Sequence, residues 1–243
     1  DGTISTLRQG WEKVMLPLML ELISGPHDAD QSLEEKVRSY IDRSTGIQTI
    51  EQMVWLVDTA DREKLNPDPP RDPWACKSIY IRRLHDYIKE RRKSLEDKTE
   101  PPDNFMVAGS RSWLDFLSRQ QIKMYLASGT DEKDVRYEAG LLHVDHYFRE
   151  IAGARPYIAD CAKEKVIKML LDEHSVPPGE LVVFGDGPVE ISIGRQIGAR
   201  TVGIASNEIL RKGVDSKKKT RLEKAGADII IGDFLPSTLS CLP

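Results

Sequence analysis

The chain has 243 residues, of which 40% are hydrophobic and 30% are charged, and its formal net charge is -4. This length suits one large α/β domain or a core with a smaller second domain, and the mildly acidic balance argues against nucleic-acid binding. No apolar run is long enough for a membrane span, and three widely separated cysteines favour a reducing compartment, so we expect a cytoplasmic protein without membrane or nucleic-acid partners.

The start of the chain is typical of a loop that leaves the end of a strand. Asp1-Gly2-Thr3 has the polar and glycine residues of such a loop, although no strand precedes it in the sequence. Apolar residues then fall on one helical face over residues 10–23, where Pro17 predicts a kink or a late helix start.

The next stretch is helical by its periodicity. A stiff, proline-rich connection is predicted over residues 66–73, which can be neither regular helix nor central strand. No strand pattern occurs between residues 10 and 102, which predicts an all-helical insertion of roughly a hundred residues. The helices expected after the first one cover residues 33–41, 49–58 and 79–95.

The pattern changes after residue 110. A short helix at residues 112–119 is followed by a strand at residues 122–127, which ends in Ser128-Gly129-Thr130 ahead of an acidic helix start. Small hydroxyl residues between a strand and a helix N-terminus are well placed to bind phosphate, since backbone N–H groups point the same way. A simple N-cap role for Ser128 or Thr130 is the alternative.

Two histidines and a lysine-rich helix follow. His143 and His146 lie in a loop without an evident third ligand, so loop or core histidines are a better interpretation than a metal site. The helix expected at residues 162–173 begins with Lys163-Glu164-Lys165.

The last third alternates strand and helix, which predicts a doubly wound parallel sheet. The expected strands cover residues 181–184, 201–204 and 227–231, and the expected helices cover residues 190–197 and 217–224.

Two carboxylates follow the strand at residues 181–184. Asp186 and Glu190 would place oxygen ligands at the strand tip, where open α/β sheets bind ligands, and such ligands suit Mg²⁺. The alternative is a plain turn, because Gly-Asp-Gly-Pro is good turn chemistry.

Together these residues resemble the haloacid dehalogenase-like phosphohydrolase superfamily over nearly the whole chain. That superfamily has four motifs at strand ends: Asp-x-Asp-Gly-Thr, a Ser or Thr, a Lys, and Gly-Asp-x-x-x-Asp/Glu. The first is matched only in its second half. The matching residues are Asp1, Ser128, Lys163 with Lys165 as the alternative, Asp186 and Glu190.

The resemblance implies a Rossmann-like α/β core at residues 1–9 and 107–243. It also implies an inserted all-helical cap of the C1 kind at residues 10–106, as in phosphoglycolate phosphatases and β-phosphoglucomutases. In that superfamily the nucleophile lies two residues before the position of Asp1. We therefore expect the sequence to be a portion of a longer chain, because losing a central strand would cost more than a typical stability of roughly 5–15 kcal/mol.

The resemblance implies Mg²⁺-dependent hydrolysis of a phosphate monoester of a small metabolite through an aspartyl-phosphate on that upstream Asp. Asp1 would be the acid/base, and its backbone carbonyl would bind Mg²⁺ together with Asp186 and the upstream Asp. Glu190 would orient the metal shell through water or contact the ion directly. Ser128, Gly129 and Lys163 would bind the phosphoryl group.

The cap is expected to select the substrate, with Arg43, Gly46 and Gln48 as candidate specificity residues. A phosphosugar mutase and a catalytically inactive binding or regulatory domain are the alternatives, and an Asp two residues before Asp1 would favour the enzyme. A nucleotide-binding oxidoreductase is a poor fit because no G-x-G-x-x-G follows a strand. The oligomeric state is expected to be monomer or homodimer.

Overall fold

Four helices form the first part of the fold. The structure, a computed structural model, describes residues 1–155, 162–172 and 176–240. Residues 10–102 are all described and contain no strand, which confirms the helical prediction for this stretch. The helices are α1 (Glu12–Ser24), α2 (Gln31–Arg43), α3 (Thr49–Glu63) and α4 (Pro73–Glu96).

These helices share an apolar cluster of their own, with Met15, Met53 and Leu84 among its buried members. Such a cluster is what amphipathic helices form when they pack on one another and not on a sheet. A separate cap with boundaries at residues 10–106 stays a prediction.

Helix α4 starts six residues earlier than its apolar pattern suggests. Asp72 is its N-cap, with a side-chain oxygen that accepts a 2.9 Å hydrogen bond from the Trp74 N–H, and Pro73 occupies the first turn. Proline is favoured there because its missing N–H would have no helical partner. The proline-rich connection therefore ends by starting the helix.

Strands and helices alternate in the rest of the chain. The strands are β1 (Met124–Asp131), β2 (Phe148–Ala154), β3 (Val182–Gly185), β4 (Arg200–Ile204) and β5 (Ile229–Ile231). The helices are α5 (Ser110–Arg119), α6 (Glu132–Leu141), α7 (Ala162–Asp172), α8 (Pro188–Gln196), α9 (Ser216–Ala225) and α10 (Pro236–Leu239), with short 3₁₀ helices η1 (Pro102–Phe105), η2 (Asp145–Tyr147) and η3 (Pro178–Glu180).

All strand pairs in the described residues are parallel, which confirms the predicted α/β class. They form two sheets, β1-β2 and β3-β4-β5. β4 is mostly buried, whereas β1 and β3, each at an edge of its sheet, are mostly half-buried. The strand expected before Asp1 stays a prediction.

Strand β2 was not predicted from the sequence. Its residues, Phe-Arg-Glu-Ile-Ala-Gly-Ala, include two charged and three small side chains, so they lack the apolar run typical of a buried parallel strand. Pairing with β1 from Met124↔Phe148 onward makes this segment a strand.

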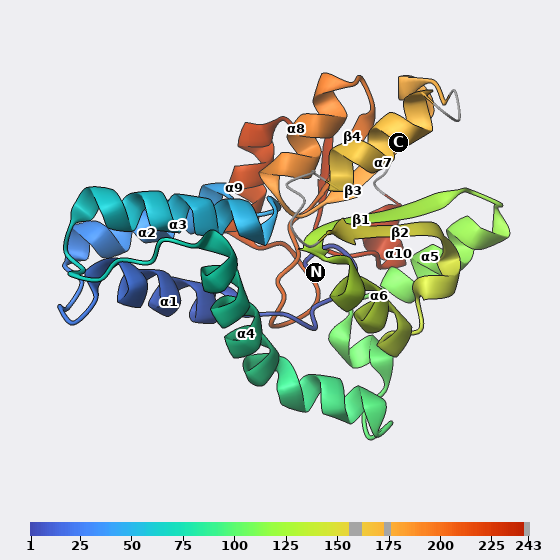
Figure 1. Ribbon diagram of the computed structural model, residues 1–243. Coiled ribbons are helices and arrows are strands. Elements are labelled where there is room, and N and C mark those ends of the chain that lie inside the picture. Colours follow the sequence, from blue (N-terminus) through green and yellow to red (C-terminus); the bar gives the residue numbers. More distant parts are fainter. Residues whose placement is uncertain (156–161, 173–175, 241–243) are drawn as a thin grey trace.

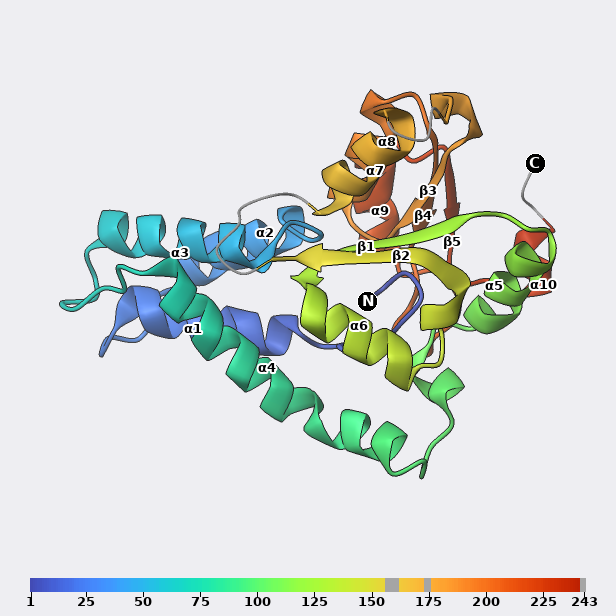
Figure 2. The same ribbon diagram turned by 45° about the vertical axis from the view of Figure 1, so that its right-hand side comes forward.

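Figure 1 shows helices α1–α3 on one side, the strands with α5–α10 on the other, and the N-terminus between them. Helix α4 connects the two parts and runs alongside α6 (Figure 2). Its residue Ile88 belongs to the cluster of the first helices, whereas Leu95 packs in the cluster below β1 and β2. Within the described part of the chain, every helix is too short or too polar to cross a lipid bilayer.

Candidate active site

The N-terminal loop lies against the carboxyl end of β3. The Thr3 hydroxyl donates a 3.0 Å hydrogen bond to Asp186 Oδ1, and the Ser206 hydroxyl donates one of 2.9 Å to the Gly2 carbonyl. Gly2 has φ of 77°, and a Cβ there would collide with the Asp186 carboxylate, so any other residue would be strained. The residues expected for the first and fourth motifs are therefore neighbours.

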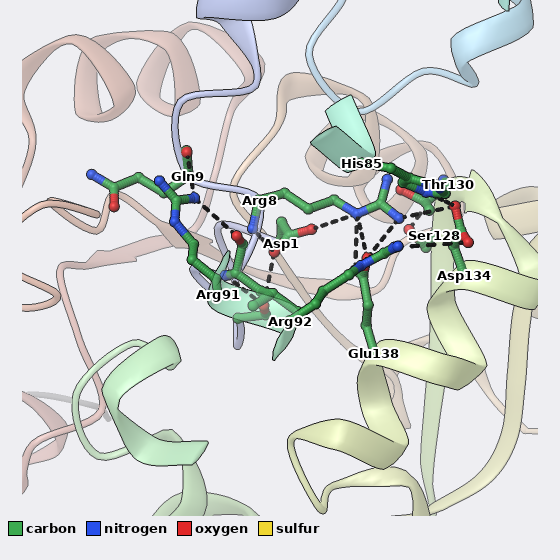
Figure 3. Close-up of polar contacts among 12 residues, drawn as sticks. Asp1, Arg8, Gln9, His85, Arg91, Arg92, Ser128, Thr130, Asp134 and Glu138 are labelled. Carbon is green, nitrogen blue, oxygen red and sulfur yellow. Dashed lines mark hydrogen bonds and ion pairs between the residues drawn. The ribbon is translucent and has the colours of Figure 1, made fainter. Parts of the chain in front are cut away.

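Asp1 is held by two donors from its own loop. Its Oδ1 accepts hydrogen bonds from the Ser5 hydroxyl at 2.7 Å and from the Arg8 N–H at 3.1 Å. Its Oδ2 lies 3.5 Å from Arg8 Nε. The carboxylate therefore has a defined orientation at one end of a larger charged network (Figure 3).

That network is buried between the N-terminal loop, α4 and α6 (Figure 3). The Arg8 guanidinium donates to both Glu138 oxygens, with Nε and Nη2 distances of 2.8 Å, and to Asp134 at 3.2 Å. From α4, Arg92 also pairs with Glu138, and His85 Nε2 lies 2.9 Å from Asp134 Oδ2. The carboxylates compensate the cations, which is the usual condition for charge burial.

The network changes the pKa of its members. Burial raises the pKa of Asp134, but the hydrogen bond to His85 and the charges of Arg8 and Arg92 outweigh it and lower the pKa to about 2. Burial likewise raises the pKa of Glu138, and Arg8 and Arg92 reverse the direction, so it lies below its ordinary value. Both groups therefore carry negative charge near neutral pH.

Ser128 and Gly129 lie within β1, not after it. We expected the strand to end before Ser128, but β1 continues to Asp131 because Asp131 pairs with Ala154 of β2 beyond an irregular register. The Ser128 hydroxyl accepts a 3.2 Å hydrogen bond from the Thr130 N–H. Helix α6 therefore begins at Glu132, and Thr130 is not its N-cap.

The loop between α2 and α3, residues 44–48, reaches these core residues. A Cβ at Gly129 would meet the Ile47 carbonyl oxygen at 2.5 Å, and one at Gly187 would meet the Thr45 carbonyl oxygen at 2.7 Å. Backbone can approach backbone this closely only because both core positions are glycine.

Lys163 points into the same region. Its buried ammonium donates a 2.5 Å hydrogen bond to the Gly46 carbonyl and forms an ion pair with Glu190. Lys165 is exposed and lines a separate surface hollow with Glu150 and Lys168. The geometry favours Lys163 over Lys165 as the lysine of the site.

Among the candidate specificity residues, Gly46 makes the contacts with the core. Its carbonyl receives the Lys163 hydrogen bond, and a Cβ on it would lie 2.7 Å from Glu190 Oε2. Arg43 is exposed with its guanidinium 5.3 Å from the centre of the Tyr40 ring, and Gln48 is buried at the N-cap of α3.

Helix α9 adds charged residues that the sequence interpretation missed. Lys218 Nζ lies 3.8 Å from Asp186 Oδ2 and pairs with Glu208, while Arg221 Nη2 donates a 3.1 Å hydrogen bond to the Asp186 carbonyl. Burial lowers the pKa of Lys218, but Asp186 and Glu208 outweigh it and raise the pKa above its ordinary value. The three-residue spacing of Lys218 and Arg221, one helical face, was the available signal.

Burial also raises the pKa of Glu12, with a further contribution from Glu208. This carboxyl, from the first turn of α1, joins the charged residues around Lys218.

The residues fit Mg²⁺ by the kind of ligand they offer. Asp186 and Glu190 are carboxylates, the ligands that Mg²⁺ prefers, and the buried Glu190 Oε2 has no hydrogen-bond partner among the described residues. Among the described residues, no three His, Cys, Asp or Glu side chains lie close enough together to hold a metal ion. Asp1, Asp186 and Glu190 therefore do not form a three-residue metal cluster. His146 is exposed, at 4.0 Å from Asp145, and belongs to no such group either.

The sequence is similar to a known protein family. A family model described as haloacid dehalogenase-like hydrolase matches residues 28–204. No curated protein matches the sequence significantly.

Solved structures share the fold at low identity. A protein described as a predicted phosphatase from Clostridium acetobutylicum is 14% identical, with a TM-score of 0.57, covering 96% of this chain and 90% of its own. A β-phosphoglucomutase from Clostridium difficile is 16% identical, with a TM-score of 0.60 and coverage of 96% and 88%. A protein described as a predicted phosphoglycolate phosphatase from Haemophilus somnus is 16% identical, with a TM-score of 0.56 and coverage of 90% and 88%.

Proposed function

The chain belongs to the haloacid dehalogenase-like hydrolase family, and from this premise we propose that it hydrolyses a phosphate monoester of a small metabolite. One observation carries the proposal. Three segments far apart in the sequence meet beneath the α2–α3 loop: β1 with Gly129, the start of α7 with Lys163, and the first turn of α8 with Glu190. The N-terminal loop lies beside these segments, because the Thr3 hydroxyl donates a hydrogen bond to Asp186.

Each residue has a chemical role in this proposal. The Lys163 ammonium would neutralise charge on the transferred phosphoryl group, and Ser128 with the amides near Gly129 would donate hydrogen bonds to its oxygens. Asp1 would protonate the leaving oxygen and then accept a proton from water, and Ser5 and Arg8 orient it for this task. In this proposal the nucleophile would be an Asp two residues before the position of Asp1, as the family resemblance implies, and it would form the aspartyl-phosphate.

Asp186 and Glu190 are the side chains proposed to hold Mg²⁺, together with the backbone carbonyl of Asp1. When bound, the ion would reduce the repulsion between a carboxylate nucleophile and an anionic phosphate. Lys218 of α9, with its Nζ 3.8 Å from Asp186 Oδ2, neutralises part of the Asp186 charge.

The test is a screen of the intact protein against sugar phosphates, phosphoglycolate and para-nitrophenyl phosphate, with Mg²⁺ and with EDTA. Phosphate release that requires Mg²⁺ and disappears in Asp186→Asn supports the proposal, provided that circular dichroism shows an intact fold. Asp28→Asn, an exposed position between α1 and α2, is the control and should keep full activity. No release of phosphate from any ester would reject the proposal, and recovery of an isomeric sugar phosphate would assign the mutase alternative.

A further inference from the structure

A single guanidinium joins the helical part of the fold to the loop after β3. Arg221, on α9, donates through Nη1 to Asp42 Oδ1 and to the Thr45 hydroxyl, both at 3.1 Å. Through Nη2 it donates to the Asp186 carbonyl, also at 3.1 Å. The Arg221 side chain is 14% exposed, whereas the Asp42 side chain is 67% exposed, so the bonds to Thr45 and Asp186 are the better shielded ones.

The two partners on the helical side flank the start of the α2–α3 loop. Asp42 lies in the last turn of α2, and Thr45 is in the loop itself. The next two residues, Gly46 and Ile47, make the contacts with Lys163 and Gly129 described above. Arg221 therefore holds the loop at the point where it comes over the proposed catalytic residues.

Helix α4 is held to the rest of the fold by a different set of contacts. Helix α4 pairs with the last residue of β1 and with α6 through Lys77–Asp131, His85–Asp134 and Arg92–Glu138. These pairs lie along the length of α4 and leave the α2–α3 loop untouched. The loop contacts depend on the short connections made by Arg221 and Lys163.

We propose that Arg221 is a positioning residue that keeps the α2–α3 loop closed over bound substrate, acting through Asp42 and Thr45. The proposal rests on the phosphatase function proposed above. A guanidinium suits this task because its planar donors can reach two segments at once, which a lysine ammonium on a flexible stem does less well. Loss of the connection lowers the fraction of protein with a closed loop, and apparent substrate affinity falls with that fraction.

The kinetic test uses para-nitrophenyl phosphate with Mg²⁺ and the intact protein. Arg221→Ala should raise KM by about tenfold or more and change kcat by less than about threefold. The closed loop stabilises bound substrate and the transition state equally, so its loss weakens binding without slowing the chemical step. The KM of Arg221→Lys should lie between the values of the wild type and of Arg221→Ala. Arg195→Ala is the matched control, since Arg195 pairs with Asp228 at 2.6 Å on an exposed surface away from the loop, and it should leave both constants unchanged.

A double-mutant cycle tests whether Arg221 acts through the loop. Asp42→Ala should raise KM by a smaller factor, because Thr45 remains as a partner. The double variant Arg221→Ala with Asp42→Ala should behave like Arg221→Ala alone, since both changes break the same connection. Independent, multiplying effects would overturn the proposal.

Hydrogen exchange gives a readout that does not need activity. Exchange in a peptide spanning residues 44–48 should accelerate several-fold in Arg221→Ala and in Asp42→Ala, and stay unchanged in Arg195→Ala. This result would support the holding role even in a protein that hydrolyses no phosphate ester, which separates the two proposals. Unchanged exchange in the loop, or a fall in kcat at constant KM, would overturn the inference.

Discussion

The Lys163 ammonium and the Glu190 carboxylate form a buried ion pair that also reaches the Gly46 carbonyl. The lysine comes from the start of α7, the glutamate from the first turn of α8, and Gly46 from the α2–α3 loop. One amine thus connects two core helices with the helical part of the fold. This arrangement is the centre of the proposed site and leads to the first prediction.

Replacement of Lys163 should affect catalysis far more than replacement of Lys165. We expect Lys163→Ala to lower kcat/KM by about a hundredfold or more, as for loss of one group that stabilises transition-state charge. Lys165→Ala should stay within about threefold, since Lys165 is exposed in a separate hollow. Steady-state kinetics measures kcat/KM of both variants, and urea unfolding checks that each variant keeps a stable fold. The reverse order would show that the lysine of the third motif is wrongly assigned.

A methyl group at Gly129 should push the α2–α3 loop away. Its Cβ would lie 2.5 Å from the Ile47 carbonyl oxygen, closer than atoms in contact can be, and the obstacle is backbone. We expect Gly129→Ala to raise KM for the best phosphate ester by about tenfold. Gly140→Ala in α6, where no heavy atom lies within 4 Å, is the control and should be neutral or stabilising by up to about 1 kcal/mol. Equal KM values for the two variants would contradict the closed loop.

Removal of the Glu138 carboxylate should destabilise the fold strongly. Its side chain is 9% exposed, and its loss leaves the cations of Arg8 and Arg92 without their main partner. We expect Glu138→Ala to lower the free energy of unfolding by about 3–5 kcal/mol. Glu34→Ala, which breaks an exposed pair with Arg38 one helical turn away, should cost at most about 1 kcal/mol. Urea unfolding measures both, and similar losses would mean that the buried network contributes little.

Asp134 should make stability depend on acid pH. Its folded pKa of about 2 lies below the ordinary value of 3.8, so its charged form favours the folded state. The resulting stabilisation is complete above about pH 4 and is lost as the pH falls from about 4 to about 2. The difference in unfolding free energy between wild type and Asp134→Asn, measured at about pH 6, 4 and 3, should therefore shrink with falling pH. A constant difference would show that the Asp134 charge is not the cause.

Much of the fold could be predicted because its elements have strong local patterns. The helices at residues 33–41 and 49–58 and the strands at residues 181–184 and 201–204 all occur, since apolar periodicity reflects the face that each element buries. Strand β2 could not be predicted, because its charged and small residues become a strand only by pairing with β1. Strand β1 extends past the predicted end at residue 127 for the same reason, because Asp131 pairs with Ala154 of β2.

The sequence by itself determined the family resemblance and the order of the polar residues at strand ends, because residue types and spacing along one strand or loop are local properties. Only the tertiary structure decided which lysine faces Glu190, that Arg8 pairs with Glu138 of α6, and that Arg221 joins Asp42 to the loop after β3. These contacts connect residues far apart in the chain, and their distances depend on how helices pack against strands. Packing of that kind leaves no periodic signal in the sequence.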